Sequence, residues 1–213
     1  MNNKLFITAA IAFGLAHTAV SMAAADNASK ANFATKVNTL IGTDYTGNTY
    51  PGAQIPFGMV QLSPDNGLPG WDRIAGYFYP DSTIAGFSHT HLSGTGAGDL
   101  YDISFLPVTL PLNDAPAPLG IHSKFSHDDE TAHAGYYQVR LTDYDINVEL
   151  TATPRCGVQR YTFPNKGRQR MVILNLTKAM NWDATKDTKI TQIDKCTIEG
   201  YRFSDGWARN QRV

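Results

Sequence analysis

The sequence lacks most of the features that reveal a function at once. Its 213 residues include 18 basic and 19 acidic ones, which leaves a net charge of −1, and no basic tract stands out. This balance argues against nucleic acid as a partner. A hydrophobic content of 42% with only 17% charged residues indicates a folded globule rather than a disordered chain. A neutral ligand such as a sugar is compatible with this composition.

Cysteine is almost absent, because Cys156 and Cys196 are the only two. No zinc-type spacing of Cys and His residues is present. A disulfide between the two is chemically allowed in an oxidising compartment, and each cysteine precedes an expected strand. The alternative is two separate buried thiols, since spacing along the chain does not supply the Cα distance that a bridge requires.

Only one long apolar run occurs, and it lies at the start of the chain. Lys4 provides a positive charge, residues 5–20 are largely apolar, and residues 21–25 are mostly small. This pattern predicts a signal peptide over residues 1–25. A run of about 16 residues is short for a membrane span, and no Cys follows it to suggest a lipoprotein. We therefore expect a periplasmic or secreted protein that is not attached to a membrane after cleavage.

Long helical periodicity is also missing, and residues 28–40 could form only a helical turn or two. Residues 26–213 are enough for one domain. They alternate between apolar and polar side chains, which is typical of half-buried antiparallel strands and predicts a mainly β fold, an antiparallel β-sandwich. The expected strands are residues 135–141, 146–152, 158–163, 171–176, 189–193 and 197–203, with shorter ones at 58–62, 85–88 and 103–108. Residues 113–120 are expected to form a linker or a hairpin loop.

What the sequence does have is a stretch rich in Gly, Pro, His and aromatic residues, from 38 to 107. Such a composition favours rigid polar loops that can form a binding surface. Two motifs in it, Gly47–Met59 and Gly86–Asp99, resemble the amino-terminal domain of glycoside hydrolase family 92. That family comprises calcium-dependent, inverting exo-α-mannosidases of bacteria. The resemblance runs from about Phe33 to the last residue, and Gly200–Phe203 and Gly206–Ala208 fit it more weakly.

The resemblance implies a function for the whole enzyme. It would hydrolyse terminal α-mannosides with inversion, for example those of N-glycans or mannans, and hold calcium on the sugar hydroxyls. The chain would provide the β-sandwich domain that forms one wall of the sugar pocket. A helical catalytic domain would be its partner and supply the general acid and base. By the same resemblance, the sandwich over residues 26–213 is expected to be incomplete at its C-terminal end.

Two local patterns could carry chemistry, and each has a plainer interpretation. Asp99 and Asp102 are a carboxyl pair in a Gly-rich loop, but such residues more often accept hydrogen bonds in turns. His89 and His91 could bind a metal, but a lone His-x-His is more often a pair of loop histidines that donate hydrogen bonds. Calcium also prefers oxygen ligands to imidazole. We therefore assign no catalytic residue and no metal ligand within the chain.

Trp71 is the best candidate for a ligand contact. Tryptophan presents a broad apolar face and an N–H donor, which suits a pyranose, although core packing is the alternative. The resemblance implies that Gly52 and Trp71 help to shape the pocket for the terminal mannose. The predicted substrate-binding set is Gly52, Trp71, His89, His91 and Asp99. The competing function is a non-catalytic carbohydrate-binding module, and a third hypothesis is a His/Asp metallohydrolase.

Overall fold

The structure is a computed structural model that describes residues 32–94, 96–110, 121–165, 168–177 and 183–213. The chain divides into two compact units after Lys36. Of the first unit, the structure describes Asn32–Lys36, where η1 (Phe33–Lys36) forms a single 3-10 turn. The expected signal peptide, part of the expected helical segment and the expected loop at 113–120 lie outside the described residues.

The second unit consists almost entirely of antiparallel β-structure. Its elements are β1 (Ala53–Gln54), β2 (Gln61–Asp65), η2 (Trp71–Arg73), β3 (Thr83–Ile84), β4 (Gly86–Ser88), β5 (Ser104–Leu110), β6 (Ser123–Lys124), η3 (His127–Asp129), β7 (Glu130–His133), β8 (Tyr136–Leu141), β9 (Ile146–Ala152), β10 (Gly157–Thr162), β11 (Gln169–Asn175), β12 (Ala184–Gln192), β13 (Ile198–Asp205) and β14 (Gln211–Arg212).

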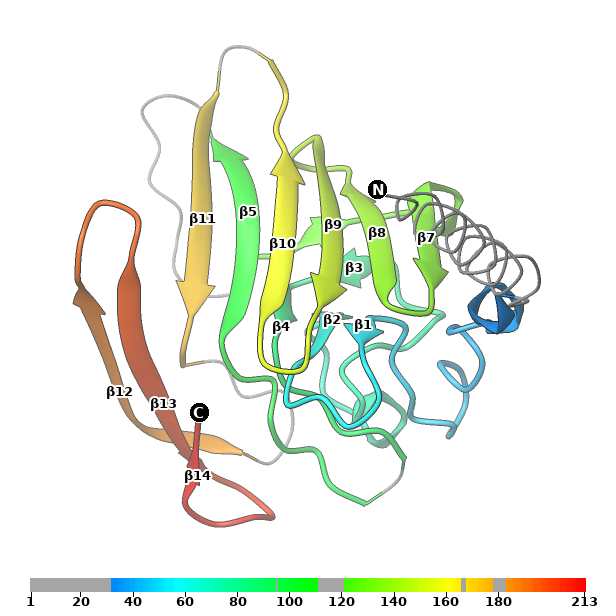
Figure 1. The fold of residues 1–213 in the computed structure, drawn as a ribbon, viewed down its shortest axis with the longest axis horizontal. Coiled ribbons are helices and arrows are strands. Elements are labelled where there is room, and N and C mark those ends of the chain that lie inside the picture. Colours follow the sequence, from blue (N-terminus) through cyan, green and yellow to red (C-terminus); the bar gives the residue numbers. More distant parts are fainter. Residues whose placement is uncertain (1–31, 95, 111–120, 166–167, 178–182) are drawn as a thin grey trace, which may run out of the picture. The chain divides into compact units, whose positions relative to one another are not determined.

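Two sheets form the body of the domain (Figure 1). One has the strand order β1-β2-β4-β5-β11, and the other has the order β10-β9-β8-β7. Strand β9 packs against β1, β2 and β5 of the first sheet. One hydrophobic core fills the space between the sheets, and its buried members include Leu62, Phe87, Leu106, Val108, Tyr137, Val139, Val148 and Leu150. The predicted antiparallel β-sandwich is confirmed.

The sequence pattern is clearest in β9, which begins and ends where the alternation predicted. Ile146, Val148 and Leu150 are at most 1% exposed, and they alternate with residues that are half-buried. Each such side chain contributes roughly 1.5–3 kcal/mol when it is fully removed from water. Strand β9, one of the two central strands of the four-stranded sheet, is therefore specified by its own side chains.

Other boundaries differ from the expected ones. Strand β2 begins at Gln61 rather than at Gly58, because the Met59 amide donates to the Pro154 carbonyl in a loop contact. Strand β12 begins at Ala184, five residues earlier than predicted, and an irregular register between Thr185 and Asp187 breaks its alternation. The strands β1, β3, β6, β7 and β14 were not predicted, since two to four residues are too few to show a period.

The possible disulfide is not formed, and both cysteines are exposed free thiols rather than buried ones. Cys156 lies in the turn between β9 and β10, where its amide donates to the Thr153 hydroxyl at 3.1 Å. Cys196 lies in the turn between β12 and β13, where its amide donates to Asp194 at 2.7 Å. The two turns belong to different sheets. Although each cysteine precedes a strand, the two thiols are therefore not brought together.

Candidate functional site

The Gly-rich loop after β4 combines backbone strain with buried polar groups. Leu100, Tyr101 and Ile103 all have positive φ angles, of 82°, 65° and 55°. Side chains larger than glycine adopt this conformation only where surrounding contacts hold them in it, and such strain is concentrated at functional sites. Tyr101 is held by hydrogen bonds with Thr90 and Ile74, and the carboxylates of Asp99 and Asp102 are held by residues near the end of the chain.

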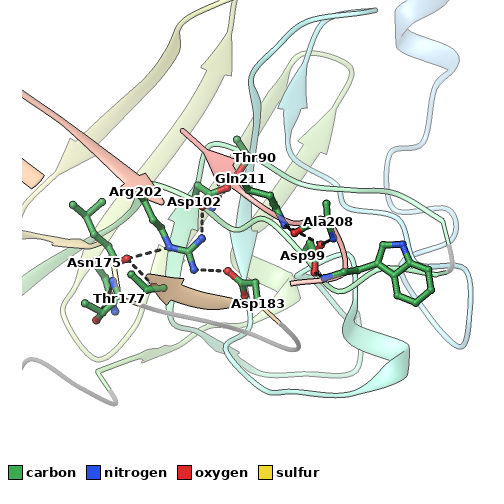
Figure 2. Close-up of polar contacts among 12 residues, drawn as sticks. Thr90, Asp99, Asp102, Asn175, Thr177, Asp183, Arg202, Ala208 and Gln211 are labelled. Carbon is green, nitrogen blue, oxygen red and sulfur yellow. Dashed lines mark hydrogen bonds and ion pairs between the residues drawn. The ribbon is translucent and has the colours of Figure 1, made fainter. Parts of the chain in front are cut away.

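Arg202 of β13 makes the central contact (Figure 2). Its side chain is 1% exposed, and its guanidinium forms ion pairs with Asp102 of the loop and with Asp183, which directly precedes β12. Its Nε also donates to the Leu176 carbonyl at 3.1 Å. The Thr90 hydroxyl completes the group, because it donates to Asp102 at 3.0 Å. One buried cation thus connects the loop, the end of β11 and the start of β12.

The charges in this network do not balance, since one guanidinium faces two buried carboxylates. Burial raises the pKa of Asp183, and its hydrogen bond to Arg202 opposes that rise. Oδ1 of Asp183 is buried without a hydrogen-bond partner among the described residues. The network is therefore held by its cation, because removal of Arg202 would leave two carboxyl groups with no counter-charge.

Asp99 makes a second set of contacts between the loop and the end of the chain (Figure 2). Its carboxylate accepts the backbone amides of Trp207 at 3.0 Å and of Ala208 at 2.7 Å, and the Gln211 side-chain amide at 2.9 Å. The side chain is 2% exposed. Asp99 therefore fixes the turn between β13 and β14, which presents the indole of Trp207 with 76% of its surface exposed.

His89 and His91 follow β4 in a bend, where the alternation of a strand does not apply, and their ring nitrogens contact separate partners. His91 is buried, with Nδ1 2.6 Å from the Gln61 carbonyl oxygen and Nε2 2.9 Å from Asp65. Nδ1 must carry a proton, since a carbonyl oxygen only accepts. His89 Nδ1 lies 2.9 Å from the Ile103 carbonyl oxygen, and burial lowers the pKa of this imidazole. Across the described ranges, no group of three or more His, Cys, Asp or Glu residues could hold a metal ion.

Gly52 is buried beside β2 and has no room for a side chain. A Cβ atom at this position would lie 2.2 Å from the Leu62 carbonyl oxygen, which is closer than any real contact. Gly52 therefore lets two backbone segments approach each other, and this requirement exists whether or not a sugar binds nearby.

Trp71 differs from the other predicted binding residues because its side chain is exposed, at 53% of its surface. It begins the 3-10 turn η2, which Arg73 holds in place through salt bridges to Asp72 at 2.9 Å and to Asp81 at 2.6 Å. Arg73 also lies over the Phe78 ring at 4.4 Å. A rigid turn that carries an exposed indole is a suitable platform for one face of a sugar.

Sequence reasoning thus found five candidates, of which His89, His91 and Asp99 have internal hydrogen-bond partners in this structure. Their role in substrate binding stays a prediction, as does that of Gly52 and Trp71. The reasoning missed Arg202, Asp183 and Trp207. The only signal for Trp207 was the weaker family motif Gly206–Ala208, and no local pattern indicated that Arg202 would be buried.

Residues 36–213 match the sequence model of the glycosyl hydrolase family 92 N-terminal domain. The chain belongs to glycosyl hydrolase family 92. Among solved structures, this family 92 chain resembles the α-mannosidase BT3965 from Bacteroides thetaiotaomicron in complex with mannoimidazole. The two are 37% identical with a TM-score of 0.78, over 85% of this chain and 24% of that one. The inverting mannosidase BT2199 of the same organism is 28% identical with a TM-score of 0.62, over 84% of this chain and 24% of that one.

A curated relative extends the comparison to fungi. An uncharacterized secreted glycosidase of Arthroderma benhamiae is 28% identical over 156 residues, which are 66% of this chain and 19% of the relative. The family 92 domain therefore spans about a fifth to a quarter of the length of these relatives. In the part of the chain that the structure describes, no helix is long and apolar enough to cross a membrane.

Proposed function

We propose that this family 92 chain acts within an exported α-mannosidase, where it forms one wall of the pocket for a terminal mannose. The substrate class would be terminal α-mannosides of N-glycans or mannans, hydrolysed with inversion. The observation that carries the proposal is the family match over residues 36–213, together with two similar structures named as mannosidases. The exposed indole of Trp71 is the contact that the chain itself would offer the sugar.

The carboxylates of the Gly-rich loop are not suited to acid or base catalysis. An inverting glycosidase needs two carboxyl groups on opposite faces of the sugar, roughly 6.5–9.5 Å apart, with a water molecule between one of them and the ring. Asp99 accepts three hydrogen bonds, and Asp102 pairs with Arg202 and Thr90. Both side chains therefore position loops. The general acid and base would come from a helical catalytic domain outside residues 26–213.

Calcium, which the family resemblance implies, does not fit the described residues. They offer no group of three or more His, Cys, Asp or Glu residues that could hold a metal ion, and the buried carboxylates of the loop already have donors. In this proposal the calcium ligands belong to the partner domain. Export rests on the signal peptide predicted over residues 1–25, and a relative named as secreted is consistent with it.

The experiment compares the chain alone with the chain in a completed enzyme. We expect residues 26–213 alone to release no mannose from an α-mannoside, with or without calcium. A chimera is then made in which these residues replace the matching part of BT3965. We expect the chimera to release mannose, since the remainder of BT3965 supplies the general acid and base. The control is the remainder of BT3965 without any amino-terminal domain.

Two results would contradict the proposal. Calcium-dependent turnover by residues 26–213 alone would place the catalytic residues inside this chain, with Asp99→Asn and Asp102→Asn as the next variants. Tight binding of mannose by the chain alone, together with no turnover in the completed enzyme, would instead favour a carbohydrate-binding module.

A further inference from the structure

One edge of the three-stranded sheet is only partly paired. The sheet has the order β12-β13-β14, and β12 pairs with β13 along its whole length, from Ile198 to Asp205. On the other side, β14 pairs with Phe203 and Ser204, and Val213 directly after it pairs with Arg202. Figure 1 shows β14 beside one end of β13 alone. No described residue pairs with β13 from Ile198 to Tyr201 on that side.

The direction of the backbone groups can be read from the pairing that exists. The Arg202 amide donates to the Val213 carbonyl at 2.8 Å, and the Val213 amide donates to the Arg202 carbonyl at 3.0 Å. Arg202 therefore turns its backbone groups towards β14. Because these directions alternate along a strand, Gly200 and Ile198 turn their amides and carbonyls the same way. These groups form a ready-made template for another strand.

An apolar cavity lies beside this open edge. It has a volume of about 160 Å³, and it is lined by residues of β5, β11, β12 and β13 and by Ile103 and Leu176, which directly flank β5 and β11. Glu199 is the only charged residue among the lining residues, which otherwise include Phe105, Leu174, Ile190 and Ile198. Ile190 is 52% exposed and Ile198 is 51% exposed, so the β12–β13 hairpin leaves large apolar side chains in contact with water.

We propose that this edge of β13 accepts an additional antiparallel β-strand, contributed by the part of the family 92 enzyme that the chain does not span. The added strand would bond to the free groups of Gly200 and Ile198, in continuation of β14. Its alternate side chains would be apolar and fill the cavity.

The choice of this occupant rests on the proposed function and on two observations. The chain spans 24% of BT3965, and the rest of such an enzyme is a source of further strands. The pairing of Arg202 with Val213 also directs β14 along the open edge rather than away from it. A second copy of the chain is the competing occupant, because open edges also pair with one another.

The test extends the chain and measures backbone protection. The chain is extended after Val213 with a segment of BT3965, namely the residues that follow the position aligned with Val213. A segment of about ten residues is enough for one strand of ordinary length. Hydrogen exchange is then measured amide by amide. We expect the amides of Gly200 and Ile198 to exchange at least about tenfold more slowly and the melting temperature to rise. The Tyr201 amide, which faces β12, is the internal control.

A variant at the edge tests the same inference independently of the fused sequence. Proline has no amide hydrogen, and at position 198 it removes a group that faces the open side while the pairing with β12 is kept. Ile198→Pro should therefore reduce the gain in melting temperature that the extension gives, whereas Ile198→Val should retain it.

Unchanged exchange at Gly200 in the extended chain would overturn the proposal. Protection that grows with concentration in the unextended chain, with a dimer in analytical ultracentrifugation, would assign the edge to a second copy and also overturn it. Neither readout depends on sugar hydrolysis. Failure of the completed enzyme to release mannose would therefore count against the proposed function and leave the strand addition standing.

Discussion

The four-stranded sheet and the Gly-rich loop are held in place by different forces. In β9, buried apolar side chains alternate with half-buried ones, its ladder partners β8 and β10 are its neighbours in the sequence, and its buried face packs against β1, β2 and β5. In the loop, buried carboxylates find their partners far along the chain, since Asp102 and Arg202 are 100 positions apart. The sheet depends on non-directional burial, whereas the loop depends on a few directional contacts that must all be present. The loop should therefore be more sensitive to single polar substitutions.

The largest effect is expected at Arg202. Arg202→Met would keep much of the volume of the side chain but leave Asp102 and Asp183 buried without a counter-charge. Breaking a buried ion pair on one side typically costs about 3–5 kcal/mol. The free energy of unfolding, measured by urea denaturation, should fall by about that amount.

The matched control for Arg202 is Arg140→Met. Arg140 pairs with Asp145 at 2.7 Å, but the two side chains are 53% and 58% exposed. Solvent screens exposed pairs so that they contribute little to stability, and this variant should therefore unfold almost like the parent chain. Equal losses in the two variants would show that the buried network is not what holds the loop.

Gly52→Ala should give the next largest loss of stability, and it separates a structural role of Gly52 from a role in sugar binding. The added Cβ would meet the Leu62 carbonyl oxygen and the Ser63 backbone, and neither can move without disturbing β2. Overpacking of this kind costs about 1–3 kcal/mol. Gly58→Ala is the control, because its nearest neighbours lie at 3.2 Å and one of them is the flexible Ile55 side chain. If Gly52→Ala melts like the parent but lowers turnover in the completed enzyme, Gly52 serves the sugar pocket instead.

Asp99→Asn tests how far one carboxylate orders the turn between β13 and β14. An amide can replace only one of the two acceptor oxygens, so at least one of the three donors loses its partner. Hydrogen bonds to charged groups contribute about 1.5–3 kcal/mol, and we expect a loss near the lower end. Asp205→Asn is the control in the same turn, since Asp205 accepts a single exposed amide, that of Asn210, at 3.0 Å. Similar losses would mean that burial of Asp99 adds nothing.

The same comparison explains what the sequence could predict. The alternation in Ile146–Ala152 specified a strand, because each side chain reports its own burial. The plainer interpretation of Asp99, as a turn residue that accepts backbone amides, agrees with its contacts to Trp207 and Ala208. Those partners lie 108 and 109 positions away, and no local pattern encodes such a distance. The positive φ of Leu100, Tyr101 and Ile103 was equally invisible, because these residues do not favour that conformation by themselves.

Trp71 should give the smallest change in stability and yet a large change in function. Its side chain is 53% exposed, so Trp71→Ala should cost about 1 kcal/mol or less of folding free energy, well below the roughly 3–5 kcal/mol of a core tryptophan. If the indole packs on the terminal sugar, the completed enzyme should lose about 2 kcal/mol or more of transition-state binding, which is at least tenfold in kcat/KM. Trp71→Phe keeps an aromatic face and should retain most of the turnover. Melting and mannose release are measured on the same sample, so that loss of fold and loss of function are not confused. A large drop in melting temperature with normal turnover per folded molecule would make Trp71 a packing residue, and the pocket wall would then need another contact.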